Sequence, residues 1–406
     1  MMVGFKVLVL FLSLGLICFS SALSFTSNIQ EDATLTAIEL IEKYGYSAEK
    51  HHVITEDGYI LEMHRISGSG VSPTADGKPI VFLMHGLLSC SVDFIVMGPG
   101  NGLGYILADS GYDVWMGNAR SNTYSKNHTT ITHSSKKSFY DFSWHEIGYY
   151  DLPAMIDYVL EQTNKEKLFY IGFSQGTTAF WVMNSLRTEY NDKIKAMIAL
   201  APVAYTKHVR SPLIKLLAYS SYPTSVLMNL VGLHEFMPSS SLTTVAGQTF
   251  CNDDTWTQFM CSNLLFLIAG FNKEQLNTTA MPVIFAHTPA GASTRQIFHY
   301  TQGITSGRFR QYDHGTLKNL KVYHSLTPPN YDLSLVTTPV HLIYGNNDWL
   351  AGVRDVKKLY GKLGNPVELI NVEDSKWNHL DFMYGIDAYQ YIYKPILSIL
   401  SKNYND

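Results

Sequence analysis

The sequence has few cysteines, few charged residues and no excess of basic ones. Its 406 residues include 4 cysteines, and 16% of the chain is charged, against about 25% in an average globular protein. So few cysteines exclude a disulfide-dense scaffold, and their spacing suggests no zinc site. The formal net charge of −4 supplies no positive field for nucleic acid. No phosphate-binding glycine loop, internal repeat or low-complexity tract is present.

Long apolar runs are also absent after the N-terminus; the run 264–270 is too short to cross a membrane. At the N-terminus, Lys6 precedes an apolar run over residues 7–19, and small residues lead to Ala22. This pattern predicts a secretory signal, residues 1–22, cleaved after Ala22. A signal anchor is the alternative, but the run is shorter than the ~20 residues of a spanning helix.

Entry into the secretory pathway would allow glycans and disulfides to form, which bears on five other positions. Asn127 and Asn277 begin acceptor sequons, so we expect both to carry glycans on surface loops. Cys251 and Cys261 are ten residues apart, and we expect them to pair. Cys90 is then an unpaired thiol, which we expect to be buried rather than reactive.

The sequence is rich in apolar residues, which form 46% of the chain, and in aromatic residues, which form 13%. These residues suit a large core or a lipid-binding cleft. Three regions differ in their pattern of apolar and polar residues. Strand-like and helical patterns alternate over 23–205, lapse over 206–328 and resume over 329–406. We therefore predict a core domain in two parts, interrupted by a cap and lid insertion at 206–328.

The alternating regions predict an α/β fold. Short apolar runs occupy 80–84, 112–116, 167–172, 194–200, 339–345 and 367–372, and helical patterns occupy 151–162 and 353–363. Strands that alternate with helices indicate a mostly parallel sheet with helices on both faces. Before them, Asp57-Gly58 separates two β-prone runs within 51–63, which predicts a hairpin.

The first motif with chemical content is Gly172-Phe173-Ser174-Gln175-Gly176, a G-x-S-x-G sequence. It stands between a predicted strand and a helical stretch at 177–186, the context in which such a serine occupies a strained turn of an α/β hydrolase. Side chains at both glycine positions would collide with the neighbouring strand and helix. An ordinary turn is the alternative; the context favours Ser174 as a nucleophile.

A serine nucleophile needs a base, and in this fold an acid and then a histidine follow it in the chain. Of 15 histidines, only His379 lies beyond the last predicted strand; it could otherwise be an ordinary helix-start residue. Asp348 follows the penultimate predicted strand, where it would orient the imidazole. Its turn-prone neighbours also suit an ordinary loop without a catalytic role. Asp374 is the rival, but it would have to loop back over five residues to reach His379.

The tetrahedral oxygen of acyl transfer needs two hydrogen-bond donors. We predict the backbone N–H groups of Gln175, directly after the nucleophile, and of Leu87, in the His85-Gly86-Leu87-Leu88 loop after an early strand. For His85 itself, a structural role that packs this loop is favoured over a catalytic one. The chemistry requires no metal and no cofactor.

In combination and order, the motifs of this chain resemble those of the acid lipase family of gastric and lysosomal lipases. The resemblance runs from about Leu40 to the C-terminus, and the composition is similar to that of insect members. The matching segments are 85–88, 117–125, 139–148, 172–177, 345–348 and 378–382.

The resemblance implies a triad of Ser174, Asp348 and His379, with oxyanion donors at Leu87 and Gln175. It also implies a mobile lid within the cap, and it places the family's cap disulfide on Cys251 and Cys261. The family often has a further cysteine where this chain has Ala269, so any role of that thiol is absent here.

We therefore expect a serine hydrolase that cleaves neutral lipid esters, triacylglycerol or steryl ester, at a lipid–water interface. It would be secreted or delivered to lysosomes, without a nucleic-acid partner. An esterase for smaller esters is the first alternative. A lipid-binding protein on an inactive hydrolase scaffold is the second, and an intact triad argues against it.

Overall fold

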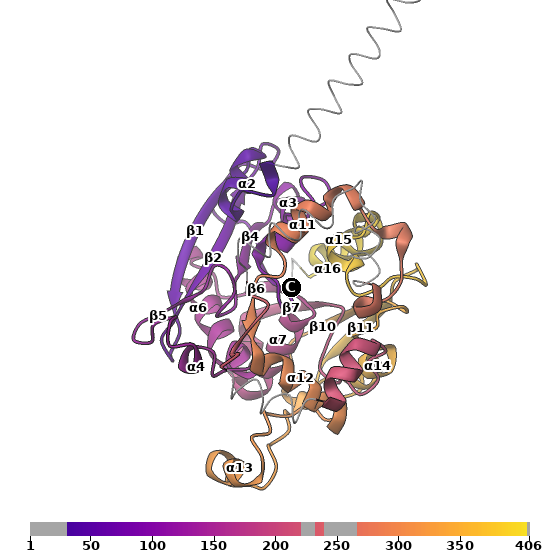
Figure 1. Cartoon of the computed structure of the whole chain (residues 1–406). Helices are drawn as coiled ribbons and strands as arrows, with labels where there is room; N and C mark the ends of the chain where they lie inside the picture. The colour runs from indigo at the N-terminus through magenta and orange to yellow at the C-terminus, as the bar shows by residue number, and fades with distance from the viewer. Residues whose placement is uncertain (1–30, 221–231, 239–265, 404–406) are drawn as a thin grey trace, which may run out of the picture.

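The computed structural model describes residues 31–220, 232–238 and 266–403. Among them, nine strands form one sheet in the order β1-β2-β4-β3-β6-β7-β10-β11, with β5 paired to β2 (Figure 1). The strands are β1 (Ser47–Ile54), β2 (Tyr59–Gly68), β3 (Ile80–Met84), β4 (Asp113–Gly117), β5 (Asn127–His128), β6 (Leu168–Phe173), β7 (Ile194–Leu200), β10 (Val340–Tyr344) and β11 (Pro366–Asn371).

Most of this sheet is parallel, as the sequence predicts. The strands β4, β3, β6, β7, β10 and β11 pair in parallel. The predicted hairpin is β1–β2, in which Ile54 lies opposite Ile60 around the turn at Gly58. Every residue of β3, β4 and β6 is buried, because a central parallel strand is covered on both faces. The alternation of strand and helix in the sequence therefore predicted the architecture correctly.

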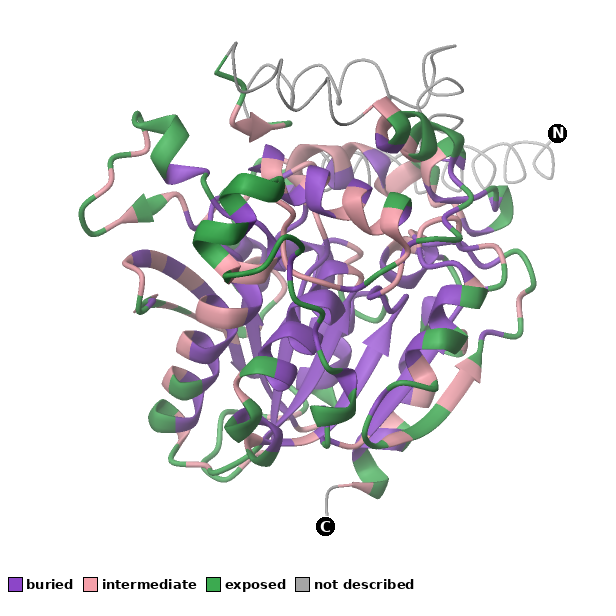
Figure 2. Ribbon diagram, turned by 90° about the horizontal axis from the view of Figure 1, so that it is seen from below, coloured by how far each residue is buried: buried purple, intermediate pink, exposed green. Residues whose placement is uncertain are grey.

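Helices lie on both sides of the sheet, with the buried strands between them (Figure 2). The predicted helices at 151–162, 177–186 and 353–363 are α6, α7 and α14. Helices of the core are α2 (Ala37–Lys43), α3 (Leu103–Asp109), α4 (Lys136–Phe139), α5 (Trp144–Glu146), α6 (Leu152–Thr163), α7 (Gln175–Leu186), α14 (Val353–Tyr360), α15 (Asp381–Tyr384) and α16 (Lys394–Lys402).

The described part of 206–328 adds α11 (Met281–His287), α12 (Thr294–Ser306), α13 (Thr316–Tyr323) and the two-stranded pair β8 (Glu235–Phe236) and β9 (Ala292–Ser293). Helix α12 covers the start of α7, where the Tyr300 hydroxyl donates to Thr178 Oγ1 at 3.0 Å. Helix α13 projects from the body (Figure 1). This segment thus lies over the end of the sheet at which β6 leads into α7.

Several positions predicted from secretion can be located. Asn127 is exposed, in the short strand β5 rather than in a loop. Asn277 is half-buried, and its Oδ1 accepts from Ala280 N. Cys90 is an unpaired, buried thiol, as predicted. The signal at 1–22 and the cysteines Cys251 and Cys261 lie outside the described residues, so both remain predictions.

Arg120 is the one arginine in the described core whose side chain is almost fully buried; its side chain is 1% exposed. It lies between two carboxylates, 2.6 Å from Asp57 Oδ2 and 2.7 Å from Asp151 Oδ1. Burial acts to lower the pKa of the Arg120 guanidinium, and the charges of Asp151 and Asp57 outweigh burial and raise that pKa above its usual range. The three charges tie the β1–β2 turn to the start of α6.

Arg120→Met is expected to lower the free energy of unfolding by about 3–5 kcal/mol, because it leaves the fully buried Asp151 carboxylate without its partner. Arg187→Met is the matched control. Its partners Glu56 and Glu189 are well exposed, so its loss should cost only about 0–1 kcal/mol. Urea unfolding of both variants measures the difference, and equal costs would show that burial does not decide the effect.

Candidate active site

Ser174 occupies a sharp turn between β6 and α7, two elements that lie near the centre of Figure 1. Its φ of 50° and ψ of −110° form a strained backbone for a residue with a side chain. A Cβ at Gly172 would lie 2.9 Å from the backbone of Gly176, and one at Gly176 would lie 2.2 Å from Met84 O in β3. The expected reason for both glycines is confirmed, because each permits a contact that a side chain would block.

The sequence-predicted residues Ser174, His379 and Asp348 come together in one hydrogen-bonded chain. His379 Nε2 lies 2.8 Å from Ser174 Oγ, and His379 Nδ1 lies 2.8 Å from Asp348 Oδ2. The serine is 205 residues from the histidine in sequence, so only the sheet topology brings them together. Ser174 is partly exposed, whereas His379 and Asp348 are 4% and 1% exposed. A substrate can therefore approach the serine from one side.

Both oxygens of the Asp348 carboxylate form hydrogen bonds. Its Oδ1 accepts from Leu350 N at 2.8 Å and from Ala351 N at 2.7 Å, which leaves Oδ2 for His379. The rival acid, Asp374, instead accepts from Asn272 and from the backbone of Lys376. The contact with the imidazole thus belongs to Asp348.

The loop after β3 lies beside Ser174 because Gly86 has no side chain. A Cβ at Gly86 would be 3.1 Å from the Phe173 ring and 3.3 Å from Ser174 Cβ. The backbone N–H of Leu87 in this loop donates to no protein acceptor among the described residues. Gln175 is the first residue of α7, so its backbone N–H has no acceptor within the helix. Both groups are available to an outside oxygen atom.

His85 has a structural place in this loop. Its Nε2 accepts from Ala119 N at 3.0 Å, and its Nδ1 donates to Gly86 O. Burial lowers the pKa of His85 to about 4, so the ring is neutral and can accept over the usual pH range. His85 therefore joins the loops that follow β3 and β4, which agrees with the favoured prediction.

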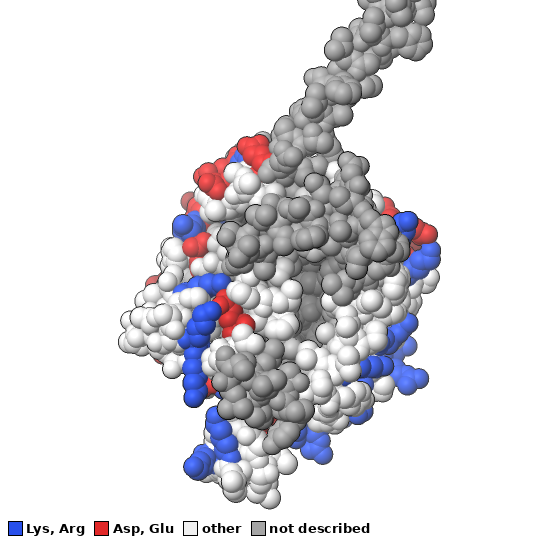
Figure 3. Space-filling view, viewed as in Figure 1, with Lys and Arg blue, Asp and Glu red and all other residues white. Residues whose placement is uncertain are grey.

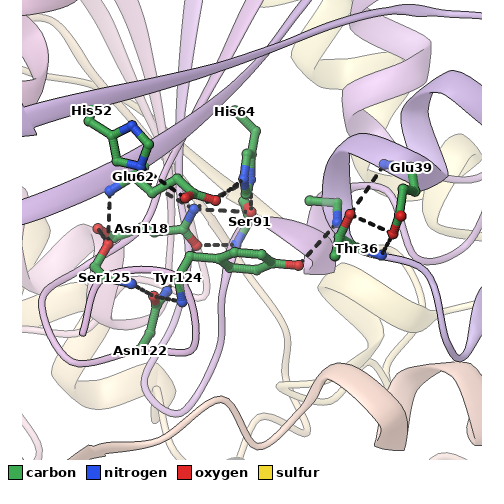
Figure 4. Close-up of polar contacts among 11 residues, drawn as sticks. Thr36, Glu39, His52, Glu62, His64, Ser91, Asn118, Asn122, Tyr124 and Ser125 are labelled. Atoms are coloured by element: carbon green, nitrogen blue, oxygen red, sulfur yellow. Dashed lines mark hydrogen bonds and ion pairs between the residues drawn. The ribbon is translucent and has the colours of Figure 1, made fainter. Parts of the chain in front are cut away.

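A polar network contacts the end of the same loop, at Ser89 and Ser91 (Figure 4). Asn118 Oδ1 accepts from Ser91 N at 2.9 Å, and Asn118 Nδ2 donates to Glu62 O at 3.1 Å. A second amide, Asn122, donates to Asn118 Oδ1 at 2.9 Å and to Ser89 O at 3.4 Å. The two asparagines join β2, β4 and the loop that ends at Ser91. Sequence reasoning singled out neither amide, although both lie in the 117–125 segment of the family resemblance.

The same network contains a serine, a histidine and a carboxylate in the order of a catalytic triad. His64 Nδ1 lies 2.7 Å from Ser91 Oγ, and His64 Nε2 lies 2.8 Å from Glu62 Oε1. Burial acts to raise the pKa of Glu62, and the hydrogen bond and charge of His64 outweigh it and lower that pKa. Ser91 has no exposed surface, so no substrate can reach it and the arrangement is structural.

A cavity of about 870 Å³ is lined in part by α12 and α13. Its walls include Arg295, Phe298, Tyr312 and His314 but none of the residues around Ser174. A metal site is also not indicated, since the described residues contain no cluster of three or more His, Cys, Asp or Glu side chains suited to an ion. The side chains that meet at Ser174 are those of a serine, a histidine and a carboxylate.

A strained serine between strand and helix, on a mostly parallel sheet, defines the class of the α/β hydrolases. The family model for the α/β hydrolase fold matches residues 79–386, and a model for a partial alpha/beta-hydrolase lipase region matches residues 37–98. A putative lipase from Sulfolobus solfataricus has a similar structure, with a TM-score of 0.55 at 12% identity over 84% of this chain and 90% of that one. That likeness concerns the fold alone.

Sequence relatives narrow the class. Lipase 1 of Drosophila melanogaster is 45% identical over 379 residues, which cover 92% of this chain and 82% of that protein. Gastric triacylglycerol lipase of Mus musculus is 38% identical over 374 residues, which cover 92% and 93%. The chain belongs to this lipase family of α/β hydrolases, and it is a carboxylic ester hydrolase.

Proposed function

We propose that the enzyme hydrolyses neutral lipid esters through an acyl-enzyme on Ser174, with His379 as general base and acid and Asp348 as the orienting carboxylate. The observation that carries the proposal is the hydrogen-bonded chain from Ser174 Oγ through His379 to Asp348, beside two free N–H groups. The relatives named triacylglycerol lipases support the substrate class.

The proposed mechanism uses each of these groups in turn. Ser174 Oγ attacks the ester carbonyl while its proton passes to His379 Nε2, 2.8 Å away. The N–H groups of Leu87 and Gln175 stabilise the oxyanion, a contribution of about 3 kcal/mol for each donor. His379 then protonates the leaving alcohol, and water cleaves the acyl-enzyme by the same steps in reverse order. Asp348 keeps the imidazole in the tautomer that can accept the proton.

A lipid surface as the place of action is supported by exposed apolar side chains in the described part of 206–328. Described residues at 213–271 expose large hydrophobic side chains: Leu213, Leu216, Tyr219, Leu233, Met237, Leu267 and Phe271. On the face seen in Figure 3, Lys and Arg side chains lie mainly along the right and lower edges, apart from a group at the left beside acidic residues. We propose that 206–328 forms the cap, since exposed apolar surface of this kind suits an interface.

The secretory route is part of the same proposal. Residues 1–22 would act as the cleaved signal, Asn127 and Asn277 as glycan acceptors, and the Cys251–Cys261 pair as a cap disulfide formed in the oxidising lumen. The mature enzyme would be secreted, with lysosomal delivery as the alternative. No helix of the described residues has the length and apolarity to span a membrane.

A substrate comparison tests the function. The enzyme is assayed with a short soluble ester and with an emulsified long-chain triacylglycerol, over acid to neutral pH, with the Ser174→Ala variant as the blank. A lipase is expected to hydrolyse the emulsion faster than the soluble ester. Hydrolysis of the short ester alone would favour a carboxylesterase, and hydrolysis of neither would favour a lipid-binding protein.

A further inference from the structure

Four consecutive residues, 269–272, contact both loops that carry the acid and the base; we refer to them as the brace. Ala269 O accepts from Trp349 N at 3.1 Å and from His379 N at 3.4 Å, so one carbonyl joins the Asp348 loop to the His379 loop. Phe271 O accepts from the Asn347 side chain at 2.7 Å. The brace comes from the segment between the two parts of the core, not from either loop.

The brace approaches so closely because of Gly270. Its φ of +116° lies where side chains are disfavoured, and a Cβ there would be 2.2 Å from Asn347 O. Asn272, the last residue of the brace, is 1% exposed. Its side-chain amide donates to Asp381 Oδ2 at 2.8 Å and to Asp374 Oδ2 at 3.2 Å. The brace thus ends in a buried polar contact with the segment around His379.

Asp381 connects Asn272 to the loop that carries His379. The same Oδ2 that binds Asn272 also accepts from Asn378 N at 2.8 Å, and Asn378 Oδ1 accepts in turn from Leu380 N at 2.8 Å. His379 therefore stands within a turn closed by side chains from both directions. Neither Asp381 nor Asn272 touches Ser174 or a reacting atom, so both would act through His379.

We propose that Asn272 and Asp381 form a positioning pair, which holds the His379 turn against the brace and so keeps the imidazole aligned between Ser174 and Asp348. The proposal deepens the proposed function and rests on it, because the imidazole is the group whose alignment matters for ester hydrolysis. Neither residue belongs to the triad, and no oxyanion donor lies on the brace.

At acid pH the protonation of Asp381 suits a hydrogen-bond acceptor that carries no charge. The pKa of Asp381 is raised to about 7: burial is the largest cause, the hydrogen bonds from Asn378 and Asn272 act to lower the pKa, and the charges of Asp374 and Asp348 act to raise it. Within the described residues Asp381 forms no ion pair, and the nearby ammonium of Lys376 pairs outward with the exposed Glu274. At acid pH the carboxyl is neutral, yet its carbonyl oxygen can still accept both bonds.

Three variants test the pair, with kcat and KM measured on a short soluble ester. Asp381→Ala, which removes the acceptor, is expected to lower kcat about 100-fold with little change in KM, as a misaligned base does. Asn272→Ala, which keeps the bond between Asp381 and Asn378, is expected to lower kcat about 10-fold. Asp381→Asn keeps an acceptor oxygen and should stay within about threefold of wild type at acid pH.

The pH profile separates the roles of acceptor and charge. Below the pKa of about 7, wild type and Asp381→Asn both carry a neutral side chain and their kcat/KM profiles should overlay. Above it only the wild-type carboxyl ionises, and its negative charge favours the imidazolium that forms in the transition state. The wild type should then exceed Asp381→Asn, and a loss in Asp381→Asn at acid pH as large as the loss in Asp381→Ala would contradict the assignment.

Gln275→Ala is the matched control. Gln275 is buried three residues after Asn272, and it makes an equivalent pair with Asp387, at 2.8 and 2.9 Å, that does not involve the His379 turn. Its loss should lower the melting temperature and leave kcat unchanged. If folded Asn272→Ala and Asp381→Ala also keep kcat within about twofold, the pair has no positioning role; if Asp381→Ala does not fold, Asn272→Ala decides.

A readout without turnover separates this proposal from the proposed function. The proton between His379 Nδ1 and Asp348 should give a downfield proton resonance in wild type and in Gln275→Ala, and the resonance should shift or disappear in Asn272→Ala. That result in an enzyme that hydrolyses no ester would leave the pair standing and reject the function. An unchanged resonance with unchanged kcat in Asn272→Ala would reject the pair.

Discussion

The Ser174→Ala variant is expected to lose ester hydrolysis by a factor of about 10⁴ to 10⁶ while it stays folded. Alanine removes the only atom of the site that can form the acyl-enzyme, and it leaves the backbone of the turn and both oxyanion donors in place. Residual hydrolysis would come from those donors and from binding alone. The measurement is kcat/KM on a short soluble ester, with the melting temperature as the check on folding.

Ser91→Ala is the matched control for this loss, because Ser91 has the same order of contacts with His64 and Glu62 but no exposed surface. It should lower stability, since a buried hydrogen bond is lost, and keep kcat/KM within about tenfold of wild type. A fluorophosphonate probe should label Ser174 and no other serine. Labelling of a different residue, or full activity in Ser174→Ala, would refute the nucleophile assignment.

The sequence predicted most of the sheet because its central strands are buried on both faces and therefore read as unbroken apolar runs. The run 194–200 is β7 itself, and 80–84 is β3. Boundaries shift where local structure intervenes. The helix predicted from residue 151 begins at Leu152, after a wide π-helical turn over Ile147–Asp151. Periodicity does not show such a turn, which lies close against α7: a Cβ at Gly148 would be 2.5 Å from Ala179 O.

The meeting of Ser174, His379 and Asp348 could be predicted because the places of these residues follow from chain order. Ser174 is marked by its glycines, and Asp348 and His379 by the strands that precede them. The supporting residues carry no such mark. Asn272 and Asp381 are 109 residues apart, and an asparagine or an aspartate in a loop is ordinary turn chemistry until the fold brings it to a partner. Only the Asn378-x-x-Asp381 spacing, typical of a turn closed by its own side chains, gave a local signal.

Asp348→Asn is expected to lower kcat about 10⁴-fold without unfolding the protein. The backbone N–H groups of Leu350 and Ala351 hold Oδ1 of this residue, so an asparagine would keep its oxygen there and turn its amide toward His379 Nδ1. That amide is a donor and binds the tautomer whose proton is on Nε2. In this tautomer the nitrogen facing Ser174 cannot accept the serine proton, and general-base catalysis is lost.

Asp374→Asn provides the comparison, because Asp374 is the rival acid of the sequence and contacts Asn272 and Lys376 N instead of the imidazole. Its loss should change kcat by less than about tenfold, since it removes no contact of the triad. Single-turnover acylation by a nitrophenyl ester measures the chemical step for both variants. Equal losses of kcat in the two variants would mean that the negative charge near the imidazole matters and the tautomer does not. We expect unequal losses, because the N–H groups of Leu350 and Ala351 fix the orientation of residue 348 and so determine the tautomer of His379.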